Sequence, residues 1–310
     1  MADSPVLVDF SEASIEFSNQ YQLVDVNWKI RATEAWLLLG SNGSGKSALI
    51  SAMVGEGRLL SGQRVSFKGQ TATVSLLAQQ TLIERERLRD DSDLTDQVFQ
   101  GTPLASLLNE DEPDPVRLHE LVQLFGMEPL LTSGFRKLST GETRKALLVK
   151  ALASPAPLLI LDEPFVGLDT AASRLLMAEL EHVAKHKTIV LVMNHLPAVP
   201  AFITHYGYLE GGRLLFQGAL KDAMVGELLK RLNHLHKADI ELPVSTGPEL
   251  LAELDPNLPL VTLRNAKVQY ADKIIFEDLD WQINQGEHWQ LTGPNGSGKT
   301  TLLALITGDN

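Results

Sequence analysis

The chain of 310 residues has a net charge of −12 and contains no cysteine. Hydrophobic residues make up 44% and charged residues 21%, which is typical of a globular protein with a buried core. Such an acidic chain is repelled by phosphate backbones, which disfavours broad nucleic-acid binding. Without cysteine it has neither a disulfide framework nor a cysteine nucleophile. No apolar run is long enough to span a bilayer and no secretory signal is visible, so we expect a cytoplasmic location, at most peripheral on the inner face of the plasma membrane.

Apolar runs alternate with helical patterns along residues 1–238. Residues 35–39 (AWLLL) predict a buried strand, followed by a glycine-rich loop and a helix from Lys46. Farther along, a mostly helical part is expected at residues 94–131, buried strands at 158–161 and 189–193, and a hairpin at 206–218. This alternation predicts an α/β fold with a mainly parallel core sheet and helices on both faces.

The loop after the first buried strand matches the phosphate-loop pattern in full. Its glycines allow a tight turn in which successive N–H groups point at phosphates, and the following helix adds the positive end of its dipole. Lys46 would supply charge to the β and γ phosphates of ATP, and the hydroxyl of Ser47 would hold Mg²⁺. The predicted ATP-binding residues of this loop are Gly40, Ser41, Asn42, Gly43, Ser44, Gly45, Lys46 and Ser47.

Two carboxylates follow the buried strand at residues 158–161. The carboxyl ends of parallel strands face the ligand site, so Asp162 is predicted to hold Mg²⁺ and Glu163 to act as general base. Without the phosphate loop, the pair would be more typical of a helix cap or an exposed acid pair after a core strand. At the end of the strand at 189–193, His195 is placed to reach the γ-phosphate.

An internal repeat runs through the chain. When Lys46 is placed on Lys299, residues 13–55 align with residues 266–308 without a gap, and Trp28, Glu34 and Trp36 meet their own residue types. This predicts two copies of one domain in tandem: residues 1–238, a proline-containing linker at 239–259, and an incomplete second copy at 260–310. The second phosphate loop consists of Gly293, Pro294, Asn295, Gly296, Ser297, Gly298, Lys299 and Thr300.

The order of motifs resembles the ABC ATPase family. It runs from the phosphate loop through LSTGE at residues 138–142 and LLILDE at 158–163 to GLD at 167–169 and His195. The resemblance implies a P-loop NTPase cassette with an antiparallel N-terminal β part and a helical signature subdomain. Residues 6–236 would form a full cassette and 260–310 the start of another. Within the family, the tandem layout is similar to molybdenum-transport ATP-binding proteins, which implies molybdate as the substrate of a partner permease.

In this family two cassettes enclose ATP between them, which assigns further residues. By resemblance, Ser139 and Gly141 would contact the γ-phosphate bound by a partner cassette, and Asp169 would lie at the dimer seam. Phe17 and Tyr270, at the same spacing before Lys46 and Lys299, fit the aromatic that stacks on adenine; for Phe17 a core role stays open. The switch glutamine is Gln79 or Gln80, with Gln79 preferred.

Departures from the family pattern keep several functions open. LSTGE stands where the family commonly has LSGGQ, and the added charge of Glu142 would slow hydrolysis. The second copy has no signature, carboxylate strand or switch histidine in this chain, so we expect a homodimer of first cassettes, a missing tandem half, or an inactive fragment. The main hypothesis is an ATPase subunit that energises a separate membrane permease. The alternatives are a soluble tandem protein in translation or DNA repair, and a nucleotide sensor without turnover.

Overall fold

The computed structural model describes residues 4–18, 21–89, 100–194, 199–220, 258–270, 273–293 and 297–308. The chain divides into two compact units, unit 1 at residues 1–236 and unit 2 at residues 237–310. Within the described ranges, no helix is both long and apolar enough to cross a membrane.

Unit 1 begins with an antiparallel β part. Strands β1 (Val6–Ser18), β2 (Tyr21–Arg31) and β4 (Arg58–Val65) form a three-stranded sheet in the order β2-β1-β4. Every strand pair in this sheet is antiparallel. Trp28 and Ile30 alternate with exposed residues along β2, so one face of the sheet is buried.

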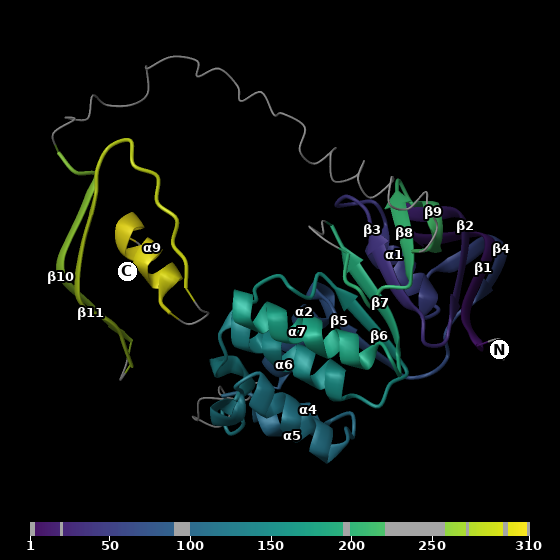
Figure 1. Ribbon diagram of the computed structural model, residues 1–310, viewed down its shortest axis with the longest axis horizontal. Helices are drawn as coiled ribbons and strands as arrows, with labels where there is room; N and C mark the ends of the chain where they lie inside the picture. The colour runs from purple at the N-terminus through teal and green to yellow at the C-terminus, as the bar shows by residue number, and fades with distance from the viewer. Residues whose placement is uncertain are drawn as a thin grey trace, which may run out of the picture. The chain divides into compact units, whose positions relative to one another are not determined.

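The core of unit 1 is a six-stranded sheet in the order β5-β6-β7-β3-β8-β9 (Figure 1). Its strands are β3 (Ala35–Leu39), β5 (Thr71–Val74), β6 (Leu158–Asp162), β7 (Thr188–Met193), β8 (His205–Glu210) and β9 (Arg213–Ala219). The pairs from β5 to β8 are parallel and only the hairpin β8–β9 is antiparallel. The predicted parallel sheet and its closing hairpin are therefore confirmed.

Both faces of this sheet are covered, because alternate residues of β3 pack in two different hydrophobic clusters. Leu37 and Leu39 pack in one hydrophobic cluster with helices α6 (Thr140–Ala153) and α7 (Thr170–Val183). Trp36 and Leu38 face the other way and pack with β1, β2 and helix α1 (Lys46–Met53). All five residues of β3 are buried, and a fully buried leucine contributes about 2 kcal/mol of transfer free energy.

A helical part lies beside the core sheet. It contains α2 (Leu76–Leu88), α4 (Leu104–Asn109), α5 (Pro115–Leu124) and the short 3₁₀ helices η1 (Glu128–Leu130) and η2 (Phe135–Lys137). Leu104, Leu121 and Phe125 belong to the same hydrophobic cluster as buried residues of α6 and of the core sheet. The expected helical region at 94–131 is confirmed over residues 104–131, and residues 94–99 lie outside the described ranges.

Unit 2 contains the ribbon β10 (Val261–Tyr270) and β11 (Lys273–Ile283) and the helix α9 (Lys299–Thr307). The repeat is visible in its side chains. Trp28 and Trp36 meet edge to face at 5.7 Å, as do Trp281 and Trp289 at 5.4 Å. In each unit the second tryptophan donates its indole N–H to the carboxylate of Glu34 or Glu287.

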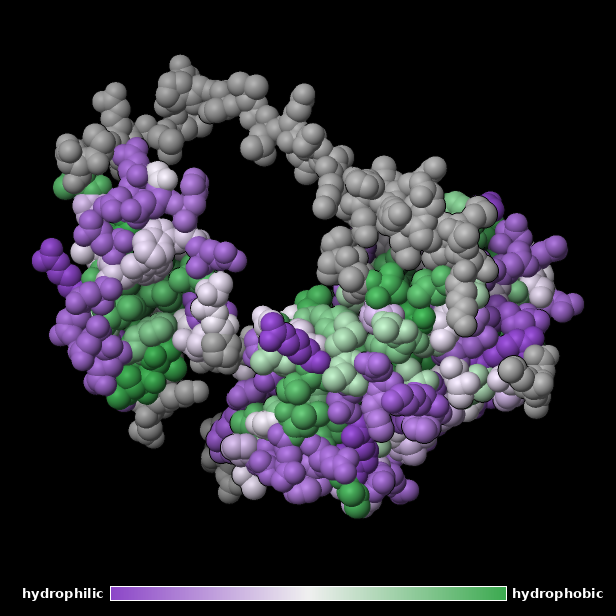
Figure 2. Space-filling view, viewed as in Figure 1, coloured by the Kyte–Doolittle hydropathy of each residue, from purple (hydrophilic) through white to green (hydrophobic). Residues whose placement is uncertain are grey.

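None of the described side chains of unit 2 is buried, in contrast to the two large clusters of unit 1. Hydrophobic side chains lie open on the face of unit 2 seen in Figure 2. Trp289 is 56% exposed and Leu303 is 52% exposed. The division after residue 236 lies close to the predicted start of the linker, and the linker itself falls almost wholly outside the described residues.

Candidate functional site

The predicted phosphate loop joins β3 to α1. A Cβ at Gly40 would lie 2.5 Å from the carbonyl oxygen of Leu209, so only glycine fits there. Gly43 and Gly45 have φ angles of 77° and 110°, in the left-handed region that favours glycine. The loop is anchored to the β8–β9 turn, because the N–H of Gly212 donates to the carbonyl of Ser44 at 2.9 Å.

Lys46 is the first residue of α1 and is only 8% exposed. Its Nζ donates to the carbonyl oxygens of Gly40 and Ser41 at 2.7 and 2.8 Å. Burial lowers the pKa of Lys46, and the nearby carboxylates of Asp162 and Glu163 act in the opposite direction. The ammonium group is thus held at the loop by two main-chain carbonyl oxygens.

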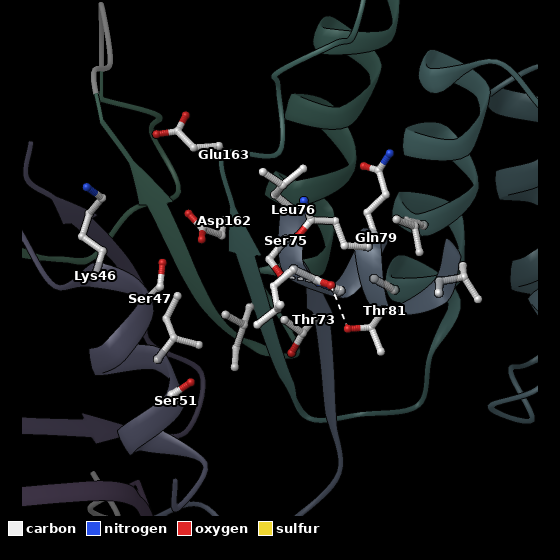
Figure 3. Close-up of a pocket in the computed structure, with 18 of the residues that line it drawn as sticks. Lys46, Ser47, Ser51, Thr73, Ser75, Leu76, Gln79, Thr81, Asp162 and Glu163 are labelled. Atoms are coloured by element: carbon white, nitrogen blue, oxygen red, sulfur yellow. Dashed lines mark hydrogen bonds between the residues drawn. The ribbon is translucent and has the colours of Figure 1, made fainter. Parts of the chain in front are cut away.

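Two acids stand at the carboxyl end of β6, facing the start of α1 (Figure 3). Burial raises the pKa of Asp162, while Lys46, Arg144 and a hydrogen bond with the Ser47 side chain lower it. The carboxylate of Glu163 accepts a hydrogen bond from the backbone N–H of Asn194, which follows β7. Burial raises the pKa of Glu163, and this backbone hydrogen bond opposes the rise.

The loop and the acids line one cleft of about 1300 Å³. Gln79 and Gln80 of α2 both line it; Gln79 is buried and Gln80 is exposed. In Figure 3, Gln79 lies on α2, farther from Lys46 than Asp162 is. The aromatic side chain of the N-terminal strands that lines the cleft is Tyr21, whereas Phe17 packs against the hydrophobic cluster near Ile15 and is absent from the lining.

The signature segment forms the start of α6. Ser139 is its N-cap, and the hydroxyl of Ser139 accepts from the N–H of Glu142 at 3.3 Å. The Glu142 carboxylate accepts in return from the N–H and the hydroxyl of Ser139 at 2.7 and 2.8 Å. This is a complete capping box, and Gly141 lies within the same first turn. Asp169 caps α7, with a carboxylate oxygen 4.0 Å from Nζ of Lys145.

Several predicted site residues lie outside the described residues, namely His195, Pro294, Asn295 and Gly296. For the rest of the second loop, the structure repeats the first. Gly298 is the N-cap of α9 with a φ of 90°, and Lys299 donates to the carbonyl of Gly293 at 2.8 Å. Ser297 precedes Gly298, Thr300 follows Lys299 in α9, and Tyr270 is the last residue of β10.

Sequence reasoning missed Arg144 and Tyr21, which the structure brings to the same cleft. Arg144 is only 6% exposed, and its guanidinium donates to the main-chain oxygens of Asp162 and Glu163. An arginine in the second turn of a helix is usually solvated, so the sequence offered no signal for its burial. Tyr21 fits the pattern of an ordinary strand residue, so the sequence did not indicate that its side chain lines the cleft.

The chain matches the ABC transporter family over residues 23–166 and 276–310, which is more than half of its length. It is 40% identical over 285 residues to the ABC transporter ATP-binding protein ModF of Escherichia coli, covering 91% of this chain and 58% of that protein. It is 26% identical over 304 residues to an uncharacterised ABC transporter ATP-binding protein of Schizosaccharomyces pombe, covering 92% of this chain and 60% of that protein. The chain thus spans less than two thirds of the length of these relatives.

Two solved structures share its fold. One is an ATP binding subunit of an ABC transporter, with a TM-score of 0.58 and 23% identity over 74% of this chain and 98% of that chain. The other is a bacterial Atm1-family ABC exporter with ATP bound, with a TM-score of 0.56 and 18% identity over 78% of this chain and 44% of that chain. These likenesses agree with the predicted α/β cassette fold. From the motifs, the fold and the family match together, the chain belongs to the ABC transporter family.

Proposed function

We propose that unit 1 binds ATP with Mg²⁺ in its cleft and hydrolyses the terminal phosphate. One observation carries this proposal: Lys46 and Ser47 from the loop meet Asp162 and Glu163 from β6 within a single cleft. An ammonium group, a hydroxyl and a pair of acids beside a glycine-rich helix start are the parts that phosphoryl transfer requires.

The loop residues would bind the phosphates through their N–H groups, and Lys46 would balance the charge of the β and γ phosphates. Gly43 and Gly45 keep this loop tightly turned, and Gly40 leaves room for it. Glu163 would accept a proton from the attacking water as general base. Its carboxylate is held by the N–H of Asn194, so it is oriented before the substrate arrives.

Ser47 and Asp162 would hold Mg²⁺, and the hydrogen bond between their side chains supports the proposal that both contact one ion. The described residues contain no cluster of three or more His, Cys, Asp or Glu that could hold a metal alone. This fits Mg²⁺, which binds through one or two protein oxygens and takes its other ligands from phosphates and water. When bound, the ion neutralises charge on the phosphates.

The remaining roles follow from the family resemblance and are part of the proposal. His195 would contact the γ-phosphate, and Gln79, rather than the exposed Gln80, would sense it from α2. Ser139 and Gly141 would contact the γ-phosphate held by a partner cassette, either in a homodimer or in a longer tandem protein. By resemblance, Phe17 and Tyr270 would stack on adenine, although Tyr21 and not Phe17 lines the cleft. Gly293–Thr300 would form a second nucleotide site.

The ATPase would energise a separate membrane permease, from the cytoplasmic side of the membrane. The family match and the names of the relatives support a transport role, while molybdate as substrate rests on resemblance alone. A soluble role in translation or DNA repair has less support, because the net charge of −12 disfavours nucleic acid. A nucleotide sensor without turnover would bind ATP as proposed here but would not hydrolyse it.

Steady-state hydrolysis and ATP affinity of the purified chain test the proposal. Glu163→Gln should lower kcat by about 100-fold or more and leave ATP bound, since it removes only the general base. Lys46→Ala should weaken ATP binding by about 10- to 100-fold, because it removes charge-assisted contacts to phosphate. Glu181→Gln, an exposed acid on α7, serves as the matched control and should change neither value.

Each failure has a different meaning. Unchanged ATP affinity in Lys46→Ala would show that the loop is not the nucleotide site. Equal, near-zero hydrolysis by the unaltered protein and Glu163→Gln, with ATP still bound, would favour the sensor.

A further inference from the structure

Arg144 occupies an unusual position between the signature helix and the strand-end acids. It lies in the second turn of α6, five residues after the N-cap Ser139. Its Nη2 donates to the carbonyl oxygen of Asp162 at 3.0 Å and to that of Glu163 at 2.8 Å. One guanidinium nitrogen therefore bridges two consecutive main-chain carbonyls at the point where β6 ends.

The charge of this guanidinium is buried without a direct ion pair. Arg144 is 6% exposed, and none of the ion pairs among the described residues includes it. Its Nε is buried and has no hydrogen-bond partner. Burying a cation in this way costs several kcal/mol, so a purely packing role would be served better by an apolar side chain of similar size.

The two carbonyls belong to a turn that needs support. Glu163 has a φ of 49°, in the left-handed region that a non-glycine residue adopts at a cost of about 1 kcal/mol or more. Its N–H donates to the carbonyl of Val192 at 2.9 Å, and its carboxylate accepts from Asn194, so β7 holds this residue from one side. Arg144 of α6 donates a hydrogen bond to the main-chain carbonyl of Glu163 and so holds the same residue from another side.

We propose that Arg144 is a positioning residue, which fixes the backbone of Asp162 and Glu163 and so aims the Glu163 carboxylate into the cleft. The proposal rests on the proposed ATPase function for its kinetic consequence. Arg144 need not touch the nucleotide, because it acts through the main chain of Glu163, the proposed general base. It also links α6, which begins after the N-cap Ser139 and contains Gly141 in its first turn, to the end of β6.

The test compares Arg144→Met and Arg144→Lys in the full chain, with Arg174→Met of α7 as the control that removes an exposed arginine. Arg144→Met should lower kcat by about 100-fold, as expected when a reacting group is displaced by about 1 Å, and leave KM and ATP affinity within about 2-fold. The kcat of Arg144→Lys should lie between that of Arg144→Met and that of the unaltered protein, because lysine keeps the charge and reaches a carbonyl with a single donor group.

A second readout does not depend on hydrolysis. Amide hydrogen exchange should become faster at Glu163 and Asn194 in Arg144→Met, since their N–H groups are bonded only while Glu163 keeps its place. If the unaltered protein fails to hydrolyse ATP, the proposed function falls, and hydrogen exchange alone decides the positioning role.

Three results would overturn the inference. The first is an unchanged kcat in Arg144→Met, and the second is an unchanged rate of amide exchange at Glu163 and Asn194 in that variant. The third is a loss of ATP affinity in Arg144→Met as large as its loss of kcat, with the same loss of affinity in Arg144→Lys. If Arg144→Met does not fold, Arg144→Lys carries the test alone, and a kcat equal to that of the unaltered protein would refute the proposal.

Discussion

Gly45 is the N-cap of helix α1 and has a φ of 110°, and a Cβ added there would lie 2.0 Å from the hydroxyl of Tyr21. That hydroxyl is buried and without a hydrogen-bond partner, and burial raises the pKa of Tyr21. The glycine therefore serves two physical needs, a left-handed backbone and a close approach of the β2 side chain to the phosphate loop. The first need is visible in the motif, while the second arises only from the fold.

Gly45→Ala should lower the free energy of unfolding by about 2 kcal/mol or more, because strain and steric overlap add. Gly126→Ala is the matched control: Gly126 has a φ of 65° and nothing within 4 Å of an added Cβ, so it should cost only about 1 kcal/mol. Urea unfolding measures both. Adding Tyr21→Phe to Gly45→Ala should recover part of the loss, and a double variant no more stable than Gly45→Ala alone would contradict this account.

At the scale of elements, one carboxylate joins three helices. Glu110 caps α4 and accepts hydrogen bonds from Arg85 of α2 at 2.8 Å and from Lys150 of α6 at 2.6 Å. Burial alone would raise the pKa of Glu110, but Lys150 and Arg85 outweigh it and hold the pKa below its ordinary value of 4.5. The helix that carries Gln79 is thereby linked to the helix that carries Ser139.

A lowered pKa in the folded protein means that Glu110 stabilises the fold above about pH 4.5 and loses that effect as the pH falls through its folded pKa. The unaltered protein should therefore be more stable than Glu110→Gln near pH 7, and the difference should shrink in acid. Thermal unfolding of both proteins as a function of pH measures it. A difference that stays constant into strongly acidic solution would show that the effect of the substitution is not electrostatic.

At the scale of the whole molecule, burial is distributed unequally. Unit 1 holds both hydrophobic clusters and every strand of the core sheet, whereas no described side chain of unit 2 is buried. A ribbon of two strands and one helix exposes most of its apolar surface when no other layer covers it. The stability of the chain should therefore reside in unit 1.

Residues 1–236 produced alone should unfold cooperatively at nearly the same temperature as the full chain, since they keep all the buried residues that the structure describes. Residues 237–310 alone should show no cooperative transition. Calorimetry of the two segments and the full chain makes this comparison. A large loss of stability on removing residues 237–310 would show that unit 2 contributes to the folded core.

Much of this architecture could be predicted from local pattern alone. The run at residues 35–39 followed by glycines predicted a strand, a tight glycine-rich turn and a helix, and the structure confirms all three. The apolar runs at 158–161 and 189–193 form β6 and β7, as predicted. The roles of Glu163, His195 and Gln79 in hydrolysis stay predictions, because geometry shows position and not turnover.

The sequence by itself determined the strand–helix alternation, the duplicated phosphate loop and the candidate acids, because each depends on residues close together in the chain. Only the tertiary structure decided which side chains from distant segments share the cleft. Arg144 lies beside the carbonyls of Asp162 and Glu163, and Asn194 beside the carboxylate of Glu163, through the packing of α6, β6 and β7. The physical reason is that burial and hydrogen-bond partners depend on how these elements pack, and no local pattern encodes that arrangement.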